Sequence, residues 1–286
     1  MCGRFVTASS PALLADRFDV DDVQVALFEP SYNVAPRELV LVVRQREHRR
    51  VLSRVRWGLV PSWAKDPSIG DRMINARADG LAEKPAYKRP FAKKRCLIPA
   101  DGFYEWRVVG PPRTPKGRPQ KQPMFIHRRD GEPMAFAGLW DVWKIPDDWE
   151  WTPEATGCGA GTLRRREPGL EPSLATATDE ETVGREAPGP QGDERDDRWL
   201  RTCAIVTGEP NELVAPIHDR MPVVLPESAW ATWLDPANDD VDELGGLLVP
   251  VPSEQLEMWP VSNAVNSADN KGPEVVDPVE PIEHSS

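Results

Sequence analysis

The sequence predicts an α+β protein that is rich in strands and carries a few short helices. Three observations support this class. Short apolar or alternating segments recur along the chain, three other segments have the pattern of short helices, and no repeat of about 20–50 residues is visible. With 286 residues the chain is long enough for one large domain or two ordinary ones, and its 40% hydrophobic content can fill a core.

The predicted elements follow in chain order. Ser10 is a suitable N-cap, and Pro11 a suitable first residue, for a short amphipathic helix over PALLADRF. A second helix is expected to open at 226–228, and a third is expected over 240–248. Strands are expected over 39–44, 51–58, 101–107, 123–128, 134–140 and 202–207.

The domain organisation follows from composition. Residues 1–145 and 199–272 are expected to form one strand-rich domain. Between them, 146–198 is dense in Pro, Gly, Glu and Asp, has few aliphatic residues and shows no periodicity. Such a segment cannot bury enough apolar surface to offset the entropy lost on ordering, so we expect a long, mostly disordered insertion rather than a second domain. A flexible tail is expected over 273–286.

Composition also argues against several classes of protein. No apolar run approaches the ~18 residues of a membrane-spanning helix, and MCGRFVTASS lacks the apolar region of a signal peptide, so we expect a cytoplasmic protein with no membrane partner. The four cysteines are far apart and form no CxxC pair, which argues against a disulfide framework and a zinc ribbon. No Cys–His pair has ligand spacing either, so no metal and no cofactor are expected.

Charge is distributed unevenly along the chain. The net charge of −11 combines residues 1–143, with 25 Lys and Arg against 16 Asp and Glu, and residues 144–286, with 10 against 30. The basic first half can attract phosphate groups. The alternative interpretation is a salt-adapted acidic surface with chance clustering of the basic residues.

Cys2 gives the chain an unusual chemical option. Initiator methionine is normally removed when the next residue is small, so the mature chain would begin with cysteine. Its α-amine, with a pKa of about 7.7–8.0, can condense with an aldehyde to an imine, which the thiol then closes to a thiazolidine. Because Met-Cys also occurs by accident, the neighbours matter: Gly3 allows close approach, and Arg4 places a cation beside the thiol. Phe5 and Val6 are strand-like and can anchor the terminus.

Five further segments stand out: SYNVAP (31–36), WGLVPSWA (57–64), MINARAD (73–79), IPADGFYEW (98–106) and PIHDRMP (216–222). With MCGRF at the start, this series resembles the SRAP family (SOS response-associated peptidase), whose members crosslink to abasic sites in single-stranded DNA. The resemblance covers roughly 1–143 and 200–272 in unbroken order and leaves 146–198 without a counterpart. It implies a single SRAP-type domain interrupted by the insertion.

The resemblance also implies roles at the matching positions. Cys2 would be the crosslinking residue, and Asn75 would hold the ring-opened sugar beside it. Glu105 and His218 would be the proton-transfer pair, because opening the closed abasic sugar needs a general acid and base near neutral pH. Family members often have two adjacent tryptophans where this chain has Ser62 and Trp63, which predicts a smaller stacking platform. The implied DNA contacts are Arg4, Asn33, Pro36, Trp63, Arg77 and Arg220.

A basic run, KPAYKRPFAKKR (84–95), predicts a further DNA contact. Tyr87 and Phe91 are interleaved with the charges, which suits base stacking combined with phosphate attraction. The alternative is an ordinary solvated surface. The expected backbone contacts are Lys84, Lys88, Arg89, Lys93 and Lys94.

The remaining cysteines and histidines are not expected to carry chemistry. Cys96 and Cys203 lie in apolar, strand-like settings typical of a core, and Cys158 is expected to be a free thiol in the insertion. No role is expected for the three histidines other than His218, which are His48, His127 and His284.

The sequence therefore indicates an abasic-site sensor that acts as a monomer in the DNA damage response. After removal of Met1, Cys2 would form a covalent thiazolidine crosslink with abasic single-stranded DNA and shield the lesion, in association with the nucleoid during repair. Lyase-like chemistry and self-processing, with release of Met1 by the chain itself, would accompany this role. Two alternatives stay open: an N-terminal-cysteine thiol hydrolase, amidotransferase or autoproteolytic cysteine peptidase, and a non-covalent single-strand-binding module.

Overall fold

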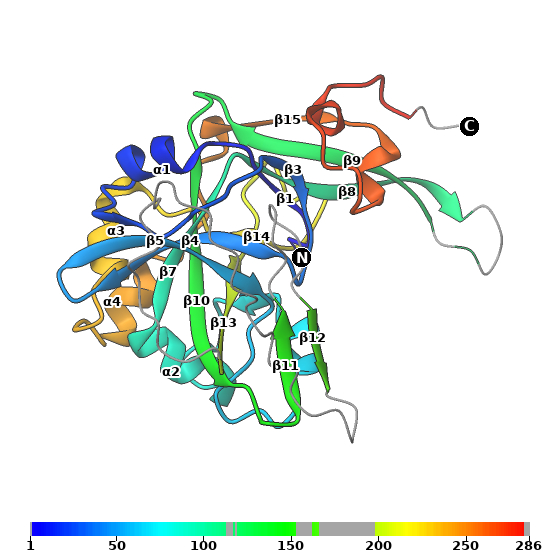
Figure 1. Cartoon of the computed structure of the whole chain (residues 1–286). Coiled ribbons are helices and arrows are strands. Elements are labelled where there is room, and N and C mark those ends of the chain that lie inside the picture. Colours follow the sequence, from blue (N-terminus) through cyan, green and yellow to red (C-terminus); the bar gives the residue numbers. More distant parts are fainter. Residues whose placement is uncertain (1, 113–116, 118, 153–161, 166–197, 283–286) are drawn as a thin grey trace, which may run out of the picture.

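The first strand of the chain lies in the interior of a sheet. β1 (Phe5–Thr7) pairs with β3 (Ser31–Val34) on one side and with β8 (Gly102–Pro112) on the other. β9 (Pro119–Arg128) and β15 (Leu256–Pro260) complete this five-stranded sheet, whose order is β15-β9-β8-β1-β3 (Figure 1). Because β1 has bonded neighbours on both edges, the amino terminus is tied into the fold. The computed structural model describes residues 2–112, 117, 119–152, 162–165 and 198–282.

The larger sheet curls on itself like a barrel. Its order β13-β10-β7-β4-β5 closes through a parallel pairing of β13 with β5, in which Thr202 lies opposite Arg56 and Cys203 opposite Trp57. The short strands β2, β6 and β14 are attached to its edges and to β13. The bounds are β2 (Asp22–Val23), β4 (Leu39–Arg46), β5 (Arg49–Trp57), β6 (Asn75–Arg77), β7 (Arg95–Ala100), β10 (Met134–Lys144), β13 (Trp199–Gly208) and β14 (Met221–Pro222).

Helices cover one face of the larger sheet (Figure 1). Their apolar side chains, among them Leu14, Phe91 and Trp233, form one cluster with sheet residues such as Leu52 and Leu97. None of the helices in the described part of the chain has the length and hydropathy needed to cross a membrane. The bounds are α1 (Pro11–Arg17), α2 (Pro85–Lys93), α3 (Glu227–Leu234) and α4 (Val241–Gly246), with short 3-10 helices η1 (Pro67–Arg72), η2 (Ser253–Gln255), η3 (Asn263–Asn266) and η4 (Pro273–Val276).

A second apolar cluster lies between the two sheets. Phe5 of β1 is at its centre, with ring centroids 5.1 Å from Trp57 and 6.1 Å from Phe136, both in edge-on contact. Cys96 and Cys203 are fully buried in the same cluster, which confirms the predicted core positions.

The predicted α+β class with many strands and few short helices is confirmed. All the predicted strands and helices are present, and Ser10 caps α1 by accepting a hydrogen bond from the Leu13 amide (3.2 Å). α2 is not among the predicted elements, because Pro85 and Pro90 resemble helix breakers. Pro85 stands at the start of the helix, where no intrahelical bond is lost, and the buried residues of α2 recur at a helical spacing.

Part of the expected insertion has regular structure. β11 (Trp149–Thr152) and β12 (Thr162–Arg165) form an antiparallel hairpin, and Trp149, Trp151 and Leu163 pack against the cluster that contains Trp143. The expectation for 146–198 is a mostly disordered insertion, and these two short strands are regular structure within it, because their apolar side chains find a surface to cover. For 153–161, which includes Cys158, and for 166–197 the prediction lies outside the described residues.

The predicted flexible tail is also wrong for its first part. η4 buries Val275 completely, and the Val279 amide donates a hydrogen bond to the Pro260 carbonyl (2.9 Å). These contacts fix the chain against β15, so packing rather than composition decides its order here. Residues 283–286, which include His284, lie outside the described residues.

Asn33 connects three parts of the chain near the amino terminus. It is fully buried, and its amide nitrogen lies 2.8–3.1 Å from three carbonyl oxygens of the segment 263–270. Its amide oxygen accepts a hydrogen bond from Arg4 (2.8 Å), which also donates to the Val265 carbonyl (2.8 Å). β3, the residue preceding β1 and the segment 263–270 are therefore held together by one buried side chain.

This arrangement predicts the effect of removing the amide. Asn33→Ala should lower the free energy of unfolding by about 1–3 kcal/mol, because it removes one partner of Arg4 and the hydrogen bonds from Asn33 to the Ser267 and Asn270 carbonyls. The matched control is Asn263→Ala, an exposed asparagine of the same segment, which should change the value by less than about 0.5 kcal/mol. Urea unfolding followed by tryptophan fluorescence measures both, and equal stabilities would contradict the role assigned to Asn33.

Candidate active site

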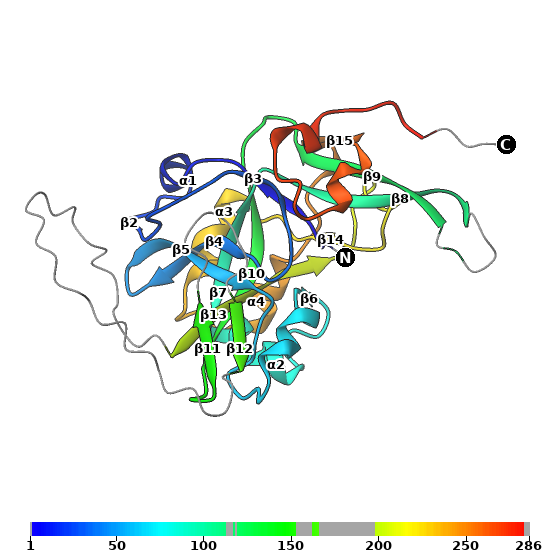
Figure 2. The same cartoon turned by 45° about the vertical axis from the view of Figure 1, so that its right-hand side comes forward.

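Cys2 lies just before β1, inside the apolar cluster between the two sheets. It is fully buried, and its thiol lies 3.9 Å from the Arg4 carbonyl oxygen. The Cys2 carbonyl accepts a hydrogen bond from Asn75 Nδ2 (2.8 Å). In both views the amino end of the chain lies beside β14 (Figures 1 and 2). Backbone pairing and one side-chain amide thus hold the start of the chain at a defined place.

Asn75 is positioned by two independent contacts. β6 runs parallel to β13, with Asn75 opposite Ile205, and the Tyr87 hydroxyl donates to the Asn75 carbonyl (3.1 Å). The side-chain oxygen of Asn75 is buried and has no hydrogen-bond partner among the described residues. This oxygen is therefore an open acceptor beside Cys2.

Glu105 in β8 is almost completely buried, although it is charged in water. Its neighbours Tyr104 and Trp106 are large aromatic residues, whose burial would be more usual. Alternation along β8 puts Glu105 on the side of Phe103, which belongs to the same cluster as Cys2. Burial raises the pKa of Glu105 above its usual value, while interactions with the amino terminus and with His218 act in the opposite direction. Cys2, Glu105 and His218, from three distant parts of the sequence, thus interact at one place.

His218 is carried by a loop that a buried turn holds in position. Its amide donates to the carbonyl of Val214 (3.0 Å), a fully buried residue whose own amide donates to Asn211 Oδ1 (3.1 Å). At the ring, the Arg220 amide donates to Nδ1 (3.0 Å), and the Asp219 carboxylate lies 2.9 Å from the same nitrogen. These two neighbours on one side of the ring, together with the held loop, fix the orientation of the imidazole.

The environment of the Cys2 thiol does not favour a thiolate. Burial raises its pKa well above the usual value, and the negative charge of Glu105 adds to the rise. A hydrolase that attacks with a thiolate needs the opposite environment, which is electropositive and partly exposed. The arrangement therefore favours chemistry in which the amine reacts first and the thiol enters later with its proton.

Arg77, Asp79 and Arg220 form an ion-pair network at the surface next to this site. Asp79 lies 2.9 Å from Arg77 Nη2 and 3.2 Å from Arg220 Nη1. The hydrogen bond from Arg77, with support from Arg220, lowers the pKa of Asp79 to about 2. Two guanidinium groups share one carboxylate, so the network keeps a net positive charge that attracts phosphate. Asp79 is not among the predicted site residues, although it ends the MINARAD motif.

Trp63 protrudes from a loop whose neighbouring residues are both anchored. The Ser62 amide donates to Asp141 Oδ2 (3.1 Å), and the Ala64 carbonyl accepts from Trp143 Nε1 (2.7 Å). Trp63 itself is 59% exposed. The backbone on both sides of Trp63 is anchored while its flat ring is open to solvent, which suits base stacking. Asp141, which is buried, is a positioning residue for this loop that the sequence pattern does not single out.

The basic run divides into free and engaged side chains. Lys93 forms an ion pair with Asp239 (3.0 Å), and Lys94 forms one with Asp141 and lies over the Trp140 ring (5.4 Å from its centroid). Lys94 is largely buried by these contacts, and Lys93 is exposed but paired with Asp239. The exposed cations of the run that form no ion pair among the described residues are Lys84, Lys88 and Arg89.

Other implied DNA contacts are also internal. Tyr87 and Phe91 are buried in the helical cluster, where a helix places its apolar face, so they cannot stack with bases as expected. Asn33 is fully buried and cannot line a surface, and Arg4 is committed to Asn33 and to carbonyl groups. Pro36 is half-buried in the turn after β3. Among the residues that the structure describes, no group of three or more His, Cys, Asp or Glu side chains could hold a metal ion.

Comparison with known proteins agrees with this geometry. The family model described as "SOS response associated peptidase (SRAP)" matches residues 1–158 and 173–268, more of the chain than the motifs alone cover. The chain is 36% identical over 278 residues to the abasic site processing protein YoqW of Bacillus subtilis (strain 168), covering 97% of this chain and 99% of that protein. It is 34% identical over 266 residues to the abasic site processing protein HMCES of Gallus gallus, covering 88% of this chain and 67% of that protein.

A crystal structure of a Bacteroides thetaiotaomicron protein has the same fold. It superposes with a TM-score of 0.68 at 21% identity and covers 98% of this chain and 100% of that one. The match to the family model extends over most of the sequence and includes Cys2, Asn75, Glu105 and His218. The chain therefore belongs to the SRAP family.

Proposed function

We propose that this protein processes abasic sites in single-stranded DNA by forming a thiazolidine crosslink through Cys2 once Met1 has been removed. One observation carries the proposal. Four groups come together at one partly buried place: Cys2, which would carry both the terminal amine and the thiol, the amide of Asn75, the carboxyl of Glu105 and the imidazole of His218. The similarity to proteins named for abasic site processing supports the same substrate.

The reaction would begin at the sugar. The closed hemiacetal opens when its hydroxyl loses a proton and its ring oxygen gains one, and Glu105 and His218 supply the acid and the base. The Cys2 amine then adds to the free aldehyde, and loss of one water gives an imine. Finally the thiol adds across the C=N bond. Sulfur bonds to carbon and the thiol proton passes to nitrogen, which closes the five-membered ring.

The surroundings of Cys2 suit this order of steps. Its raised thiol pKa keeps the proton on sulfur until the imine exists, so the thiol hydrolase and amidotransferase alternatives are disfavoured. The open side-chain oxygen of Asn75 can accept a hydrogen bond from a hydroxyl of the opened sugar. The buried position excludes water from the finished ring, and the protein stays on the lesion as a shield.

The strand would cross the surface around the site. Trp63 offers a ring for stacking, and the Arg77–Asp79–Arg220 network offers charge for phosphate. α2 lies close to β6, which carries Asn75, so its exposed cations extend this basic surface (Figure 2). All of these groups come from one copy of the chain, so a monomer suffices for the proposal.

The first prediction separates the amine from the thiol. Cys2→Ala should form no heat-stable adduct with abasic single-stranded DNA on a denaturing gel. Both Cys2→Ala and Cys2→Ser keep the terminal amine, so each should give an adduct only when borohydride reduces the imine. Cys158→Ala is the matched control and should behave like the unmodified chain. A heat-stable adduct in Cys2→Ala would contradict the proposal.

The second prediction concerns pH. Because burial raises the pKa of Glu105, its acid form persists to a higher pH than in water, and it is lost as the pH rises through that pKa. The neutral amine becomes the major form as the pH rises through about 7.7–8.0. The single-turnover crosslinking rate should therefore rise and then fall with pH.

The variant Glu105→Gln tests this assignment. It should lower the rate by about 10²–10⁴ and remove the falling limb of the profile, because Gln cannot titrate. His218→Ala should also slow the reaction without abolishing non-covalent binding of DNA. The control Glu254→Gln, an exposed glutamate, should keep the original rate and profile. An unchanged profile in Glu105→Gln would remove this carboxyl from the mechanism.

The third prediction concerns salt. If Lys84, Lys88 and Arg89 each neutralise one phosphate, these three contribute about −2 to the slope of log K against log salt for a single strand. Each change to Ala should flatten the slope by about 0.7, whereas the exposed control Lys144→Ala should not. Fluorescence anisotropy with Cys2→Ala, which prevents covalent capture, measures the slopes. A slope unaffected by all three changes would reassign α2 to an ordinary solvated surface.

A further inference from the structure

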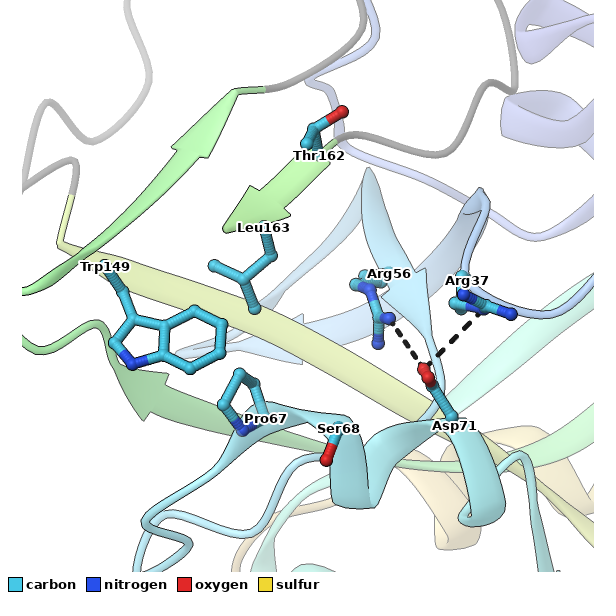
Figure 3. A pocket seen from close by; sticks show the side chains of 8 residues that line it. All are labelled: Arg37, Arg56, Pro67, Ser68, Asp71, Trp149, Thr162 and Leu163. Atoms are coloured by element: carbon cyan, nitrogen blue, oxygen red, sulfur yellow. Dashed lines mark hydrogen bonds and ion pairs between the residues drawn. The ribbon is translucent and has the colours of Figure 1, made fainter. Parts of the chain in front are cut away.

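A cavity of about 380 Å³ lies away from Cys2, between the end of β5, η1 and the hairpin β11–β12 (Figure 3). Charged side chains line one side of it and apolar side chains line the other. Its volume is within the range of small-molecule sites. The lining residues are Arg37, Arg56, Pro67, Ser68, Asp71, Trp149, Thr162 and Leu163.

The charged side carries more positive than negative groups. Arg56 Nη2 lies 3.0 Å from Asp71 Oδ1, and Arg37 Nε lies 3.7 Å from the same oxygen (Figure 3). The side chain of Arg56 is only 7% exposed, and its Nε and Nη1 atoms have no hydrogen-bond partner among the described residues. Two guanidinium groups therefore depend on one carboxylate, and an anion at this wall would complete their pairing. Arg37, with 62% of its side chain exposed, is the group that an incoming anion reaches first.

The apolar side is continuous with the Trp63 loop. The Trp149 ring stands edge-on to Trp143 (6.5 Å between centroids), and Trp143 Nε1 donates to the Ala64 carbonyl (2.7 Å). Ala64 directly follows Trp63, and the same segment continues into η1, which forms the floor of the cavity. The apolar wall of the cavity and the residue that follows Trp63 therefore belong to one packed cluster.

We propose that this cavity binds one nucleotide unit of the DNA strand, with its phosphate at Arg37 and Arg56 and its base against Trp149. A nucleotide has both an anionic phosphate and a planar base, and these match the charged wall and the apolar wall of the cavity. Phosphate alone would leave the apolar wall unused, and an apolar ligand would leave the charged wall unpaired. The proposal rests on single-stranded DNA being the substrate, as proposed above.

The experiment is anisotropy of labelled single-stranded DNA across a salt series, with the full chain carrying Cys2→Ala. Arg37→Gln should flatten the salt slope by about 0.7, as expected for one lost phosphate contact. Trp149→Ala should weaken binding about tenfold and leave the slope unchanged, as expected for one lost stacking contact. The matched controls are Arg49→Gln, an exposed arginine at the other end of β5, and Trp199→Ala, a 42% exposed tryptophan that does not line the cavity. Neither control should show the corresponding change.

Thermal unfolding of each variant identifies a folding defect, and Arg37→Gln keeps the test valid if Trp149→Ala disturbs the hairpin. Thymidine monophosphate, added as a competitor, separates a free nucleotide from a nucleotide in the strand. If thymidine monophosphate binds with the same dependence on Arg37 and Trp149 but DNA does not, the assignment to the strand is wrong. If the two variants match their controls for DNA, the proposal is also wrong. If the unmodified chain crosslinks normally and either of these two results is found, only the proposal for the cavity is wrong. If Arg37→Gln and Trp149→Ala have the expected effects on DNA binding but the unmodified chain forms no crosslink, only the thiazolidine reaction is wrong.

Discussion

Burial of Phe5 between the two sheets is the interaction on which the rest of the structure depends. Its ring packs edge-on against Trp57 and Phe136, and the backbone on both sides of it pairs with β3 and β8. Ordering the three residues of β1 costs about 1–2 kcal/mol each. Burial of Phe5 and Val6 contributes about 1.5–3 kcal/mol each, which offsets this cost, and the backbone pairing with β3 and β8 then holds a terminus that would otherwise fray.

The position of Cys2 explains the character of the site. Cys2 is fully buried three residues before Phe5, and the core removes water from its thiol and from Glu105. Both pKa values rise for this reason, and both groups therefore keep their protons at a pH where exposed groups of the same type would lose more of them. Charge is concentrated instead on the outside, in the Arg77–Asp79–Arg220 network and on α2. The protein thus separates the attraction of DNA from the chemistry on it.

The sequence predicts much of the fold and the central residues of the site, but not their surroundings. Alternation and capping signals locate the strands and α1, and the motifs identify Cys2, Asn75, Glu105 and His218 as candidate site residues. Long-range packing decides what local pattern cannot. Pro85 and Pro90 conceal α2, the tail is ordered by the burial of Val275, and β11–β12 is ordered by contacts with Trp143.

The same limit applies to single residues at the site. Asn33 and Lys94 belong to motifs that suggest a surface, yet their partners in the 263–270 segment and on β10 bury them. Asp141 acts through Ser62, and Asp79 contacts Arg220 as well as the nearby Arg77, so spacing alone does not identify their roles. The types of residue and their order in the sequence indicate the chemistry. Side-chain contacts between distant segments decide which of these residues stay exposed at the surface.

The intact mass of the protein after incubation with abasic single-stranded DNA tests the central claim most directly. The account predicts a species whose mass is that of the chain without Met1 plus the oligonucleotide, less one water, with the modification on the peptide that begins with Cys2. An adduct on a chain that retains Met1, or on an internal cysteine or lysine, would contradict it.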